Sequence, residues 1–368
     1  MIEIKKVIKS EVPNFLENNN FWQNSFYVTT KHRLISHFNN PNIDNDDIVL
    51  LIAYLNKECV GYMGVFMDKI AIDSHLVKIG WLSTWWLDSK ARGTGIGKEI
   101  LRTMFAENNG SIGISHFTDS AKRVYDKSGY FTKLKNFVGV DFIMRLDLPA
   151  LFHYRLGTSR NNVFFQLIGD ITSAFDSLRL SFYRRKIRTS IHNVSVEYLA
   201  EMDTDVSLLV EKWNSSDLSP KSASFFDHLK KDSWILNVPC LDLSIYKDYE
   251  FSSFAYHFEI SLIKVIRDEE CIGFVVLQNR NRTTKLLFSY FDKKFVFEVA
   301  QVILLHALDS NSINLVCYVD EISDVIKRNK LFIRKKETKF SSIISESYGN
   351  IDYEGYRVQY GDGDNCFT

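Results

Sequence analysis

The sequence contains little proline, no excess of charge of either sign and no long hydrophobic run. Only 5 of its 368 residues are Pro, whereas Phe and Tyr number 28 and 17. Disordered chains are poor in aromatic residues and strongly charged, so this composition favours a folded protein. The 45 Lys and Arg residues balance 45 Asp and Glu residues, which leaves no global field to hold a nucleic acid. We therefore expect a folded protein that does not bind nucleic acid.

Cysteine spacing and hydrophobic patterning bear on whether the protein has disulfides, a zinc site or a membrane segment. The five cysteines are scattered, and no two are separated by only two residues. Such spacing predicts neither a disulfide framework nor a zinc site, and we expect no metal. The first residues lack the apolar core of a signal peptide, and the longest apolar stretch, residues 295–308, is too short and too polar to span a bilayer. We expect a cytoplasmic protein.

The length suggests about two domains. In residues 47–145, strand patterns at 48–55, 59–67, 78–87, 111–117 and 131–145 (two strand-like pieces) alternate with helix patterns at 98–106 and 120–127. This order predicts an α/β fold of layered (α+β) type, with a mixed sheet flanked by helices.

The second half repeats this order. Glu270-Cys271-Ile272-Gly273-Phe274 is similar to Glu58-Cys59-Val60-Gly61-Tyr62, and strand patterns at 283–291 and 313–318 alternate with helices at 296–308 and 321–328. We predict a tandem repeat of one fold. Its parts are an N-terminal domain of residues 1–148, a linker of residues 149–190 and a C-terminal domain of residues 191–368.

The linker contains apolar residues at steps of three and four, which predict one face of a long amphipathic helix: Phe164, Ile168, Ile171, Phe175, Leu178 and Phe182. Basic residues follow at 184–186 and 188. We expect this face to pack against the two domains. The alternative is a peripheral contact of the 161–188 helix with an anionic membrane surface.

A glycine-rich loop, Arg92-Gly93-Thr94-Gly95-Ile96-Gly97-Lys98, lies between a predicted strand and a predicted helix. Small residues let the backbone approach a phosphate closely, and the N-terminus of the helix adds a positive end. A Walker loop would require Ser or Thr after Lys98, where Glu99 stands. A dinucleotide fold would place its loop after the first strand. The loop is suited to a pyrophosphate.

Residues 47–145 resemble the GCN5-related N-acetyltransferase (GNAT) family. Arg92-x-x-Gly95-x-Gly97 is similar to the family's coenzyme A pyrophosphate loop, and Ala121-x-x-x-Tyr125-x-x-x-Gly129-Tyr130-Phe131 to its second signature. The resemblance implies acetyl-CoA as co-substrate and an N-acetyltransferase activity. The backbone of residues 93–98 would hold the pyrophosphate, and the strand Trp85-Trp86-Leu87 would pair with the pantetheine arm. The predicted cofactor-binding residues are Trp85, Trp86, Leu87, Arg92, Gly93, Thr94, Gly95, Ile96, Gly97, Lys98 and Thr118.

The candidate catalytic residues are Tyr125 and His116. By resemblance Tyr125 protonates the departing thiolate, and its ordinary phenol pKa of about 10 is close to that of the thiol. The family's usual carboxylate base is missing, because the strand holds Ser83 and Thr84 instead. His116, at the end of the next strand, is the candidate base. Thr118 stands where the family usually has an asparagine.

Other residues are candidates for the acceptor site. The region before the first hairpin usually lines that site in this family, which makes Trp22 and Arg33 candidates. The tail Gly361-Asp362-Gly363-Asp364 is expected to be a polar turn. If the tail covers the cleft, Asp362 or Asp364 would orient an acceptor amine.

The second copy contains Asp292-Lys293-Lys294-Phe295 in place of the glycine loop. Without small residues the backbone cannot enclose a pyrophosphate, so we predict that this copy does not bind coenzyme A. We expect it to wall the acceptor cleft or to form the surface of a homodimer.

The predicted function is acetyl transfer from acetyl-CoA to a primary amine of a small molecule or sugar. By analogy we expect an amino sugar of surface-polysaccharide biosynthesis. One alternative is a tandem aminoacyl transferase that uses a transfer-RNA donor, against which the glycine loop and the neutral charge count. The other is a non-catalytic acetyl-CoA-binding regulator, which the missing strand carboxylate leaves open.

Overall fold

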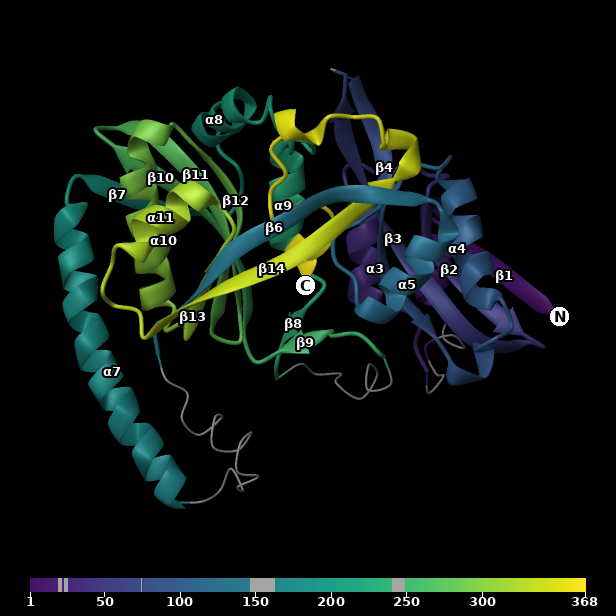
Figure 1. Cartoon of the computed structure of the whole chain (residues 1–368), viewed down its shortest axis with the longest axis horizontal. Helices are drawn as coiled ribbons and strands as arrows, with labels where there is room; N and C mark the ends of the chain where they lie inside the picture. The colour runs from purple at the N-terminus through teal and green to yellow at the C-terminus, as the bar shows by residue number, and fades with distance from the viewer. Residues whose placement is uncertain (19–21, 23–25, 74, 146–162, 240–248) are drawn as a thin grey trace.

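The protein is built on one mixed sheet that runs across both halves of the chain. A computed structural model describes residues 1–18, 22, 26–73, 75–145, 163–239 and 249–368. Within these residues, twelve strands form the sheet in the order β1-β2-β3-β4-β5-β14-β6-β13-β12-β11-β10-β7. Helices lie against the sheet in both halves (Figure 1). The predicted mixed sheet flanked by helices is thus confirmed.

The first half follows the predicted element order. The predicted hairpin is β2–β3, and its turn residues Asn56 and Lys57 have positive φ of 51° and 69°, typical of a two-residue hairpin turn. The elements are β1 (Ile2–Ile8), η1 (Lys9–Glu11), α1 (Val12–Glu17), α3 (Lys31–Asn39), β2 (Ile48–Leu55), β3 (Glu58–Ile72), β4 (His75–Leu87), η2 (Ser89–Ala91), α4 (Ile96–Glu107), β5 (Ile112–Ile114), α5 (Asp119–Ser128) and β6 (Phe131–Ile143).

The second half contains the corresponding series. The turn between β10 and β11 has positive φ at Asp268 and Glu269, 51° and 64°, as at Asn56 and Lys57. The elements are α7 (Val163–Ser190), β7 (Val194–Leu199), α8 (Thr204–Trp213), α9 (Ala223–Lys231), β8 (Leu236–Asn237), β9 (Phe254–Ala255), β10 (Phe258–Arg267), β11 (Glu270–Arg280), β12 (Thr283–Phe291), η4 (Lys293–Phe295), α10 (Val296–Asp309), β13 (Asn314–Cys317), α11 (Asp320–Lys327), β14 (Arg334–Ser345), η5 (Glu346–Tyr348), η6 (Tyr353–Gly355) and η7 (Asn365–Phe367).

The two halves exchange strands at the centre of the sheet. β6, from the first half, pairs with β13 on one side and with β14 on the other. β14, from the second half, pairs in turn with β5 of the first half. Figure 1 shows β6 and β14 crossing side by side between the halves. The expectation of two strand pieces within 131–145 is wrong, because pairing with β14 keeps β6 extended as one strand.

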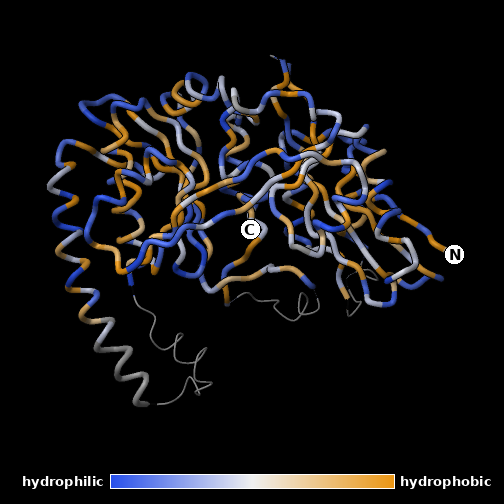
Figure 2. The backbone as a smooth tube through the Cα atoms, in the orientation of Figure 1, coloured by the Kyte–Doolittle hydropathy of each residue, from blue (hydrophilic) through white to orange (hydrophobic). Residues whose placement is uncertain are grey.

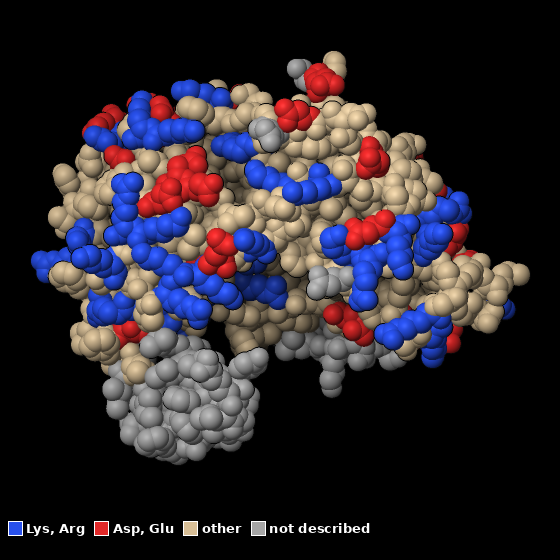
Figure 3. Space-filling model, in the orientation of Figure 1, with Lys and Arg blue, Asp and Glu red and all other residues tan. Residues whose placement is uncertain are grey.

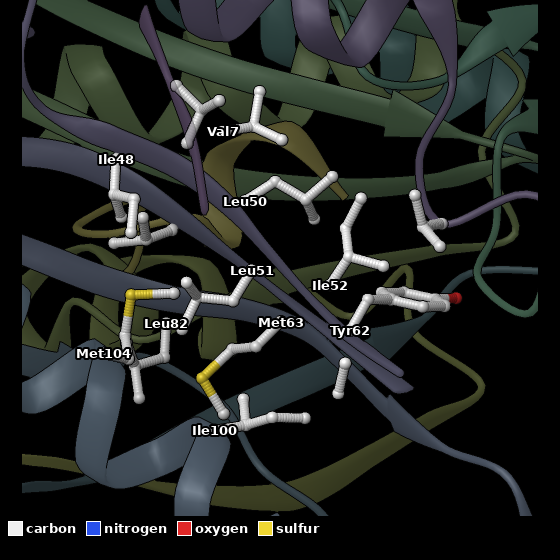
Figure 4. Close-up of a cluster of buried hydrophobic side chains, with 14 of the residues drawn as sticks. Val7, Ile48, Leu50, Leu51, Ile52, Tyr62, Met63, Leu82, Ile100 and Met104 are labelled. Atoms are coloured by element: carbon white, nitrogen blue, oxygen red, sulfur yellow. The ribbon is translucent and has the colours of Figure 1, made fainter. Parts of the chain in front are cut away.

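The hydrophobic core follows the sheet through both halves. Figure 2 shows hydrophobic residues along the strands of each half. In the first half, α4 buries Ile100 and Met104 against Leu51 and Met63 of the sheet (Figure 4). A second cluster joins the halves, since the ring of Phe66 in β3 lies 5.0 Å from that of Phe367 in the C-terminal tail. The sheet and this shared core hold the two halves together.

The long helix α7 packs through a different face from the one expected. Phe175, Leu178 and Phe182 are 67, 75 and 67% exposed, whereas Leu180 and Ile187 are buried. Two polar contacts hold the helix with this face inward. Arg184 pairs with Asp309 of α10 at 2.7 Å, and Arg179 donates to the Met144 carbonyl. For these three apolar residues, the expectation that they pack against the domains is wrong. The side chains of Phe164, Ile168 and Ile171 lie outside the described residues, as do residues 149–162 of the predicted linker.

No helix in the described part of the chain combines the length and the apolar character needed to cross a membrane.

Candidate active site

A cavity of about 390 Å³ lies where β4 and β5 diverge. The two strands pair only at Gly80 with Ile112 and at Trp81 with Gly113. Beyond these pairs, residues 82–85 of β4, Ile114 at the end of β5 and residues 116–118 after it line the cavity. Arg33 of α3 and residues 121 and 125 of α5 complete the contribution of the first half. The second half supplies residues 251 and 252, Arg280 of β11, Lys285 of β12 and tail residues 360, 364, 365 and 368.

An irregularity in β4 opens this cavity. The register between β3 and β4 shifts between Tyr62 and Gly64, and Thr84 has a positive φ of 48°. Such a bulge bends a strand and redirects its side chains. As a result Trp85 lines the cavity, whereas Trp86 packs in the core at 5.6 Å from the Tyr62 ring. Of the predicted pantetheine strand, the cavity wall therefore contains Trp85 but neither Trp86 nor Leu87.

The glycine loop has the backbone conformation that its sequence requires. Gly93 and Gly95 have positive φ of 77° and 84°, which other residues adopt only with strain. A Cβ atom at either position would meet nothing within 4 Å, so the space beside the loop is open. Thr94 fastens the turn by donating its hydroxyl to the Ala91 carbonyl at 2.7 Å. The loop is therefore fixed in shape and accessible from outside.

Positive groups face the open side of this loop. Gly95 is the N-cap of α4, and the N–H groups of Gly97 and Lys98 have no helical carbonyl one turn back. Arg92 and Lys98 are exposed, and neither forms an ion pair within the described ranges. Free N–H groups at a helix N-terminus are a binding site for phosphate. These residues fit the pyrophosphate of coenzyme A.

Tyr125 lies at the inner end of the cavity. It is 4% exposed, and its ring packs 5.3 Å from that of Trp85. Burial, together with the charge of Asp364, raises the pKa of the Tyr125 phenol above its ordinary value. The phenol therefore holds its proton at neutral pH, and its raised pKa makes it a weaker acid than the match with the thiol pKa assumed.

Thr118, which stands where the family usually has an asparagine, caps the N-terminus of α5. Its hydroxyl oxygen accepts the N–H of Ala121 at 3.3 Å and so caps the helix. Thr118 also lines the cavity. At the other end of α5, Gly129 has a positive φ of 72° and ends the helix. The second signature thus forms a capped helix that presents Tyr125.

His116 lines the same cavity from the segment that follows β5. Partial burial and the nearby charge of Lys285 lower its pKa. The imidazole is therefore neutral at pH 7 and able to accept a proton. Both predicted catalytic residues, Tyr125 and His116, line the same cavity.

The C-terminal tail brings a carboxylate into the cavity. The Asp364 carboxylate accepts a hydrogen bond from the Ser115 hydroxyl, and burial raises its pKa to about 6. The tail can pass here because of its glycines: a Cβ at Gly361 would lie 2.4 Å from Phe288, and one at Gly363 would lie 3.0 Å from Trp81. The tail is therefore packed between the halves rather than forming the expected polar surface turn.

Asp362, the other acidic residue of the tail, points into the protein interior. It is 5% exposed, accepts the N–H of Gln359 at 2.8 Å and lies 3.7 Å from Nζ of the buried Lys221. Lys221 also pairs with Asp68 of β3 at 2.5 Å. These contacts tie the tail to both halves. Asp364, and not Asp362, is the tail carboxylate at the cavity.

The two acceptor-site candidates lie in different places. Arg33 is 2% exposed and lines the cavity. Trp22 packs in the N-terminal core, where its Nε1 donates to the Phe15 carbonyl at 3.1 Å. The sequence patterns did not point to Arg280 and Lys285 of the second half, which also line the cavity. The one available signal was Lys285, a cation in the otherwise neutral strand pattern of residues 283–291.

The corresponding loop of the second half is closed. Residues 293–295 form the short helix η4, and the Asp292 carboxylate accepts the N–H of Lys294 at 3.0 Å. A separate cavity, lined by Lys293, Tyr318 and Arg357 among others, lies beside it. That this half does not bind coenzyme A remains a prediction.

Comparison with known proteins identifies the class. Residues 15–130 match the model of the acetyltransferase (GNAT) family. Residues 15–130 therefore form a GNAT domain, and the protein is an acyltransferase.

Solved structures resemble the chain over both halves. A GCN5-related N-acetyltransferase from Anabaena variabilis superposes with a TM-score of 0.52 at 6% identity, over 94% of this chain and 72% of that one. A probable N-acyltransferase from Enterococcus faecalis gives a TM-score of 0.52 at 8% identity, over the same shares of 94% and 72%. At these identities the likeness shows the fold. Among curated proteins, no sequence matches this chain.

Proposed function

We propose that this protein transfers the acetyl group of acetyl-CoA to a primary amine in the cavity between β4 and β5. The observation that carries the proposal is a continuous series of contacts from loop to tail. A Cβ at Gly97 would lie 3.5 Å from the Trp85 ring, which packs 5.3 Å from Tyr125. The charge of Asp364 acts in turn on Tyr125. The phosphate loop, the proton donor and a carboxylate thus follow one another along one path.

The residues of this path have the chemistry that acetyl transfer needs. The amine nitrogen attacks the thioester carbonyl, a C–N bond forms, and the C–S bond breaks. The proton that the amine loses passes to Asp364 or to His116, and Tyr125 donates its proton to the departing sulfur. Asp364 supplies the carboxylate that β4 lacks. Asp364 belongs to the second half. In this proposal the second half therefore forms a wall of the acceptor site and supplies a group that takes part in the reaction.

The proposed acceptor is a small amine, with an amino sugar as the first class to test. The cavity of about 390 Å³ must hold the end of the pantetheine arm as well as the acceptor amine. Aromatic and hydroxyl groups line it at Trp85, Ser83 and Tyr360. Such groups suit a sugar ring with its hydroxyls.

Release of free thiol from acetyl-CoA, measured against a panel of amines, tests the proposal. Tyr125→Phe keeps the ring contacts and removes the donor, so we expect kcat to fall about 10²–10⁴-fold. Tyr130→Phe is the matched control, since Tyr130 stacks on Phe105 at 4.1 Å and does not line the cavity. Equal rates for Tyr125→Phe and wild type would refute the role of Tyr125. Tight acetyl-CoA binding without turnover of any amine would refute catalysis and favour a regulator.

We propose in addition that α7 rests on an anionic membrane surface. Phe175, Leu178 and Phe182 form an exposed apolar row. Arg185 and Lys186 follow on the same helix, exposed and without an ion pair among the described residues. An apolar row with flanking cations is the pattern of helices that lie in the membrane interface.

A further inference from the structure

Three cations converge on the cavity from three different elements. Arg33 comes from α3, Arg280 ends β11, and Lys285 lies in β12. Arg33 is the most deeply buried, and its guanidinium stacks 4.1 Å from the ring of Trp234. Figure 3 shows that basic side chains also border the recess at the middle of the face in view. Elements of both halves therefore place positive charge around one space.

None of these cations forms an ion pair among the described residues, although Arg33 stacks on Trp234 and its charge also acts on Asp364. Nε and Nη1 of Arg33 are buried and have no hydrogen-bond acceptor. Arg280 and Lys285 form no ion pair within the described part of the chain. Burial and, to a smaller extent, the charge of Arg280 lower the pKa of Lys285 to about 8, and burial lowers the pKa of Arg280. Buried charges without partners are costly, which is the signature of a site that receives its counter-charge from a ligand.

The Asp364 carboxylate does not neutralise the charge of the three cations. Asp364 is the one acidic side chain among the cavity-lining residues that the structure describes, against three cations. Its carboxylate already accepts the Ser115 hydroxyl, and it forms no ion pair within the described residues. Among its side chains, the cavity therefore combines three cations with one carboxylate.

The three cations are separate from the phosphate loop. None of residues 92–98 lines this cavity, and the loop has its own cations in Arg92 and Lys98. Trp85 lies near Gly97 of the loop and packs on Tyr125, and Trp85, Tyr125 and Asp364 line the same cavity as the three cations. The cations accordingly belong to the acceptor end of the path and not to the pyrophosphate end.

We infer that the acceptor is an amine that carries an anionic group, a carboxylate or a phosphate, which Arg33, Arg280 and Lys285 bind. Asp364, in the same cavity, then faces the amine of the same molecule. The inference rests on the proposed function and narrows its substrate: unmodified neutral amino sugars and polycationic amines are disfavoured. Carboxylate and phosphate share the chemistry that guanidinium and ammonium groups recognise.

Matched pairs of acceptors test this inference in the full-length protein. Glucosamine is compared with glucosamine 6-phosphate, and glycinamide with glycine, by thiol release from acetyl-CoA. We expect kcat/KM to be about tenfold or more higher for the anionic member of one pair, as a charge-assisted bond would give. The pair that shows the preference identifies phosphate or carboxylate.

Variants assign the preference to the cations. Lys285→Met should lower kcat/KM for the anionic acceptor about tenfold through KM, and leave the neutral acceptor within about twofold. Lys285→Arg should restore the preference. Lys293→Met, at the cavity of the second half, is the matched control and should change neither acceptor. Arg33→Met should act like Lys285→Met, unless loss of its stacking on Trp234 unfolds the protein, which thermal unfolding would reveal.

The outcomes separate this inference from the proposed function. Equal or better use of the neutral acceptor in both pairs overturns the inference alone. An equal loss for both members of a pair in Lys285→Met also overturns it, since that result indicates a structural role. Absence of thiol release with all four amines overturns the proposed function and the inference together. Competitive inhibition by inorganic phosphate or acetate against the amine, and not against acetyl-CoA, supports the inference independently of acceptor choice.

Discussion

The strand exchange predicts that neither half of the protein folds alone. A fragment of residues 191–368 would lose β6, which pairs with all four residues of β13 and all twelve of β14. Its own core would also lose the packing of Phe137 and Phe142 of β6, which are 5 and 0% exposed in the full chain and lie in clusters with residues of the second half. Each such side chain contributes about 1.5–3 kcal/mol when buried. With the lost strand pairing, the total approaches the 5–15 kcal/mol that stabilises a typical domain.

Separate and joint expression of the two halves tests this prediction. We expect fragments 1–190 and 191–368 to lack a cooperative thermal transition by circular dichroism when made alone. Made together, they should associate, co-purify and recover the transition of the full chain, which is the control. A monomeric 191–368 fragment that unfolds cooperatively near the Tm of the full chain would refute the role assigned to β6 and β14.

Two further predictions concern the tail and the long helix. Because burial raises the pKa of Asp364 to about 6, kcat/KM for the amine should rise as pH increases through about 6, where the carboxylate loses its proton. Arg33, Tyr125 and Ser115 face that carboxylate, and His116 and Lys285 line the same cavity. Asp364→Asn should abolish the rise and lower the plateau about 10²-fold or more, and an unchanged profile in this variant would reject Asp364 as the base. For α7, Phe182→Glu should reduce co-sedimentation with vesicles of anionic lipid while leaving Tm within a few degrees, because Phe182 is 67% exposed. Equal sedimentation of wild type and Phe182→Glu, or none by either, would reject the membrane contact.

Local patterns in the sequence were sufficient to predict most elements of the fold. The hairpin β2–β3, the helices α4 and α5 and the series β12–α10–β13–α11 agree with the predicted positions within a few residues. The exchange of β6 and β14 was not predictable in this way. The residues of a strand alternate between two faces whichever strand lies beside it, so the pattern does not identify the neighbour.

The candidate site was predictable only where its residues form a local motif. Gly93 to Lys98 and Tyr125 stand in recognisable series, and the loop conformation fits the chemistry inferred from them. Arg280 and Lys285 follow the loop by almost 200 residues, and only the exchanged sheet brings them to the same cavity. The exposed row on α7 was misassigned for a related reason, because periodicity shows that a face is apolar and not what covers it.

In the proposed function, the loop of the first half binds acetyl-CoA and forms the single donor site of this chain. Calorimetric titration of acetyl-CoA into wild type and into Gly97→Glu tests it most directly. The glutamate adds bulk and negative charge beside Leu87, whose Cδ1 would lie 2.7 Å from the new Cβ. We predict one acetyl-CoA per chain in the wild type and no binding by folded Gly97→Glu, since the second half has no open glycine loop. Absence of binding by folded wild type, or two sites per chain of which one survives in Gly97→Glu, would contradict the account.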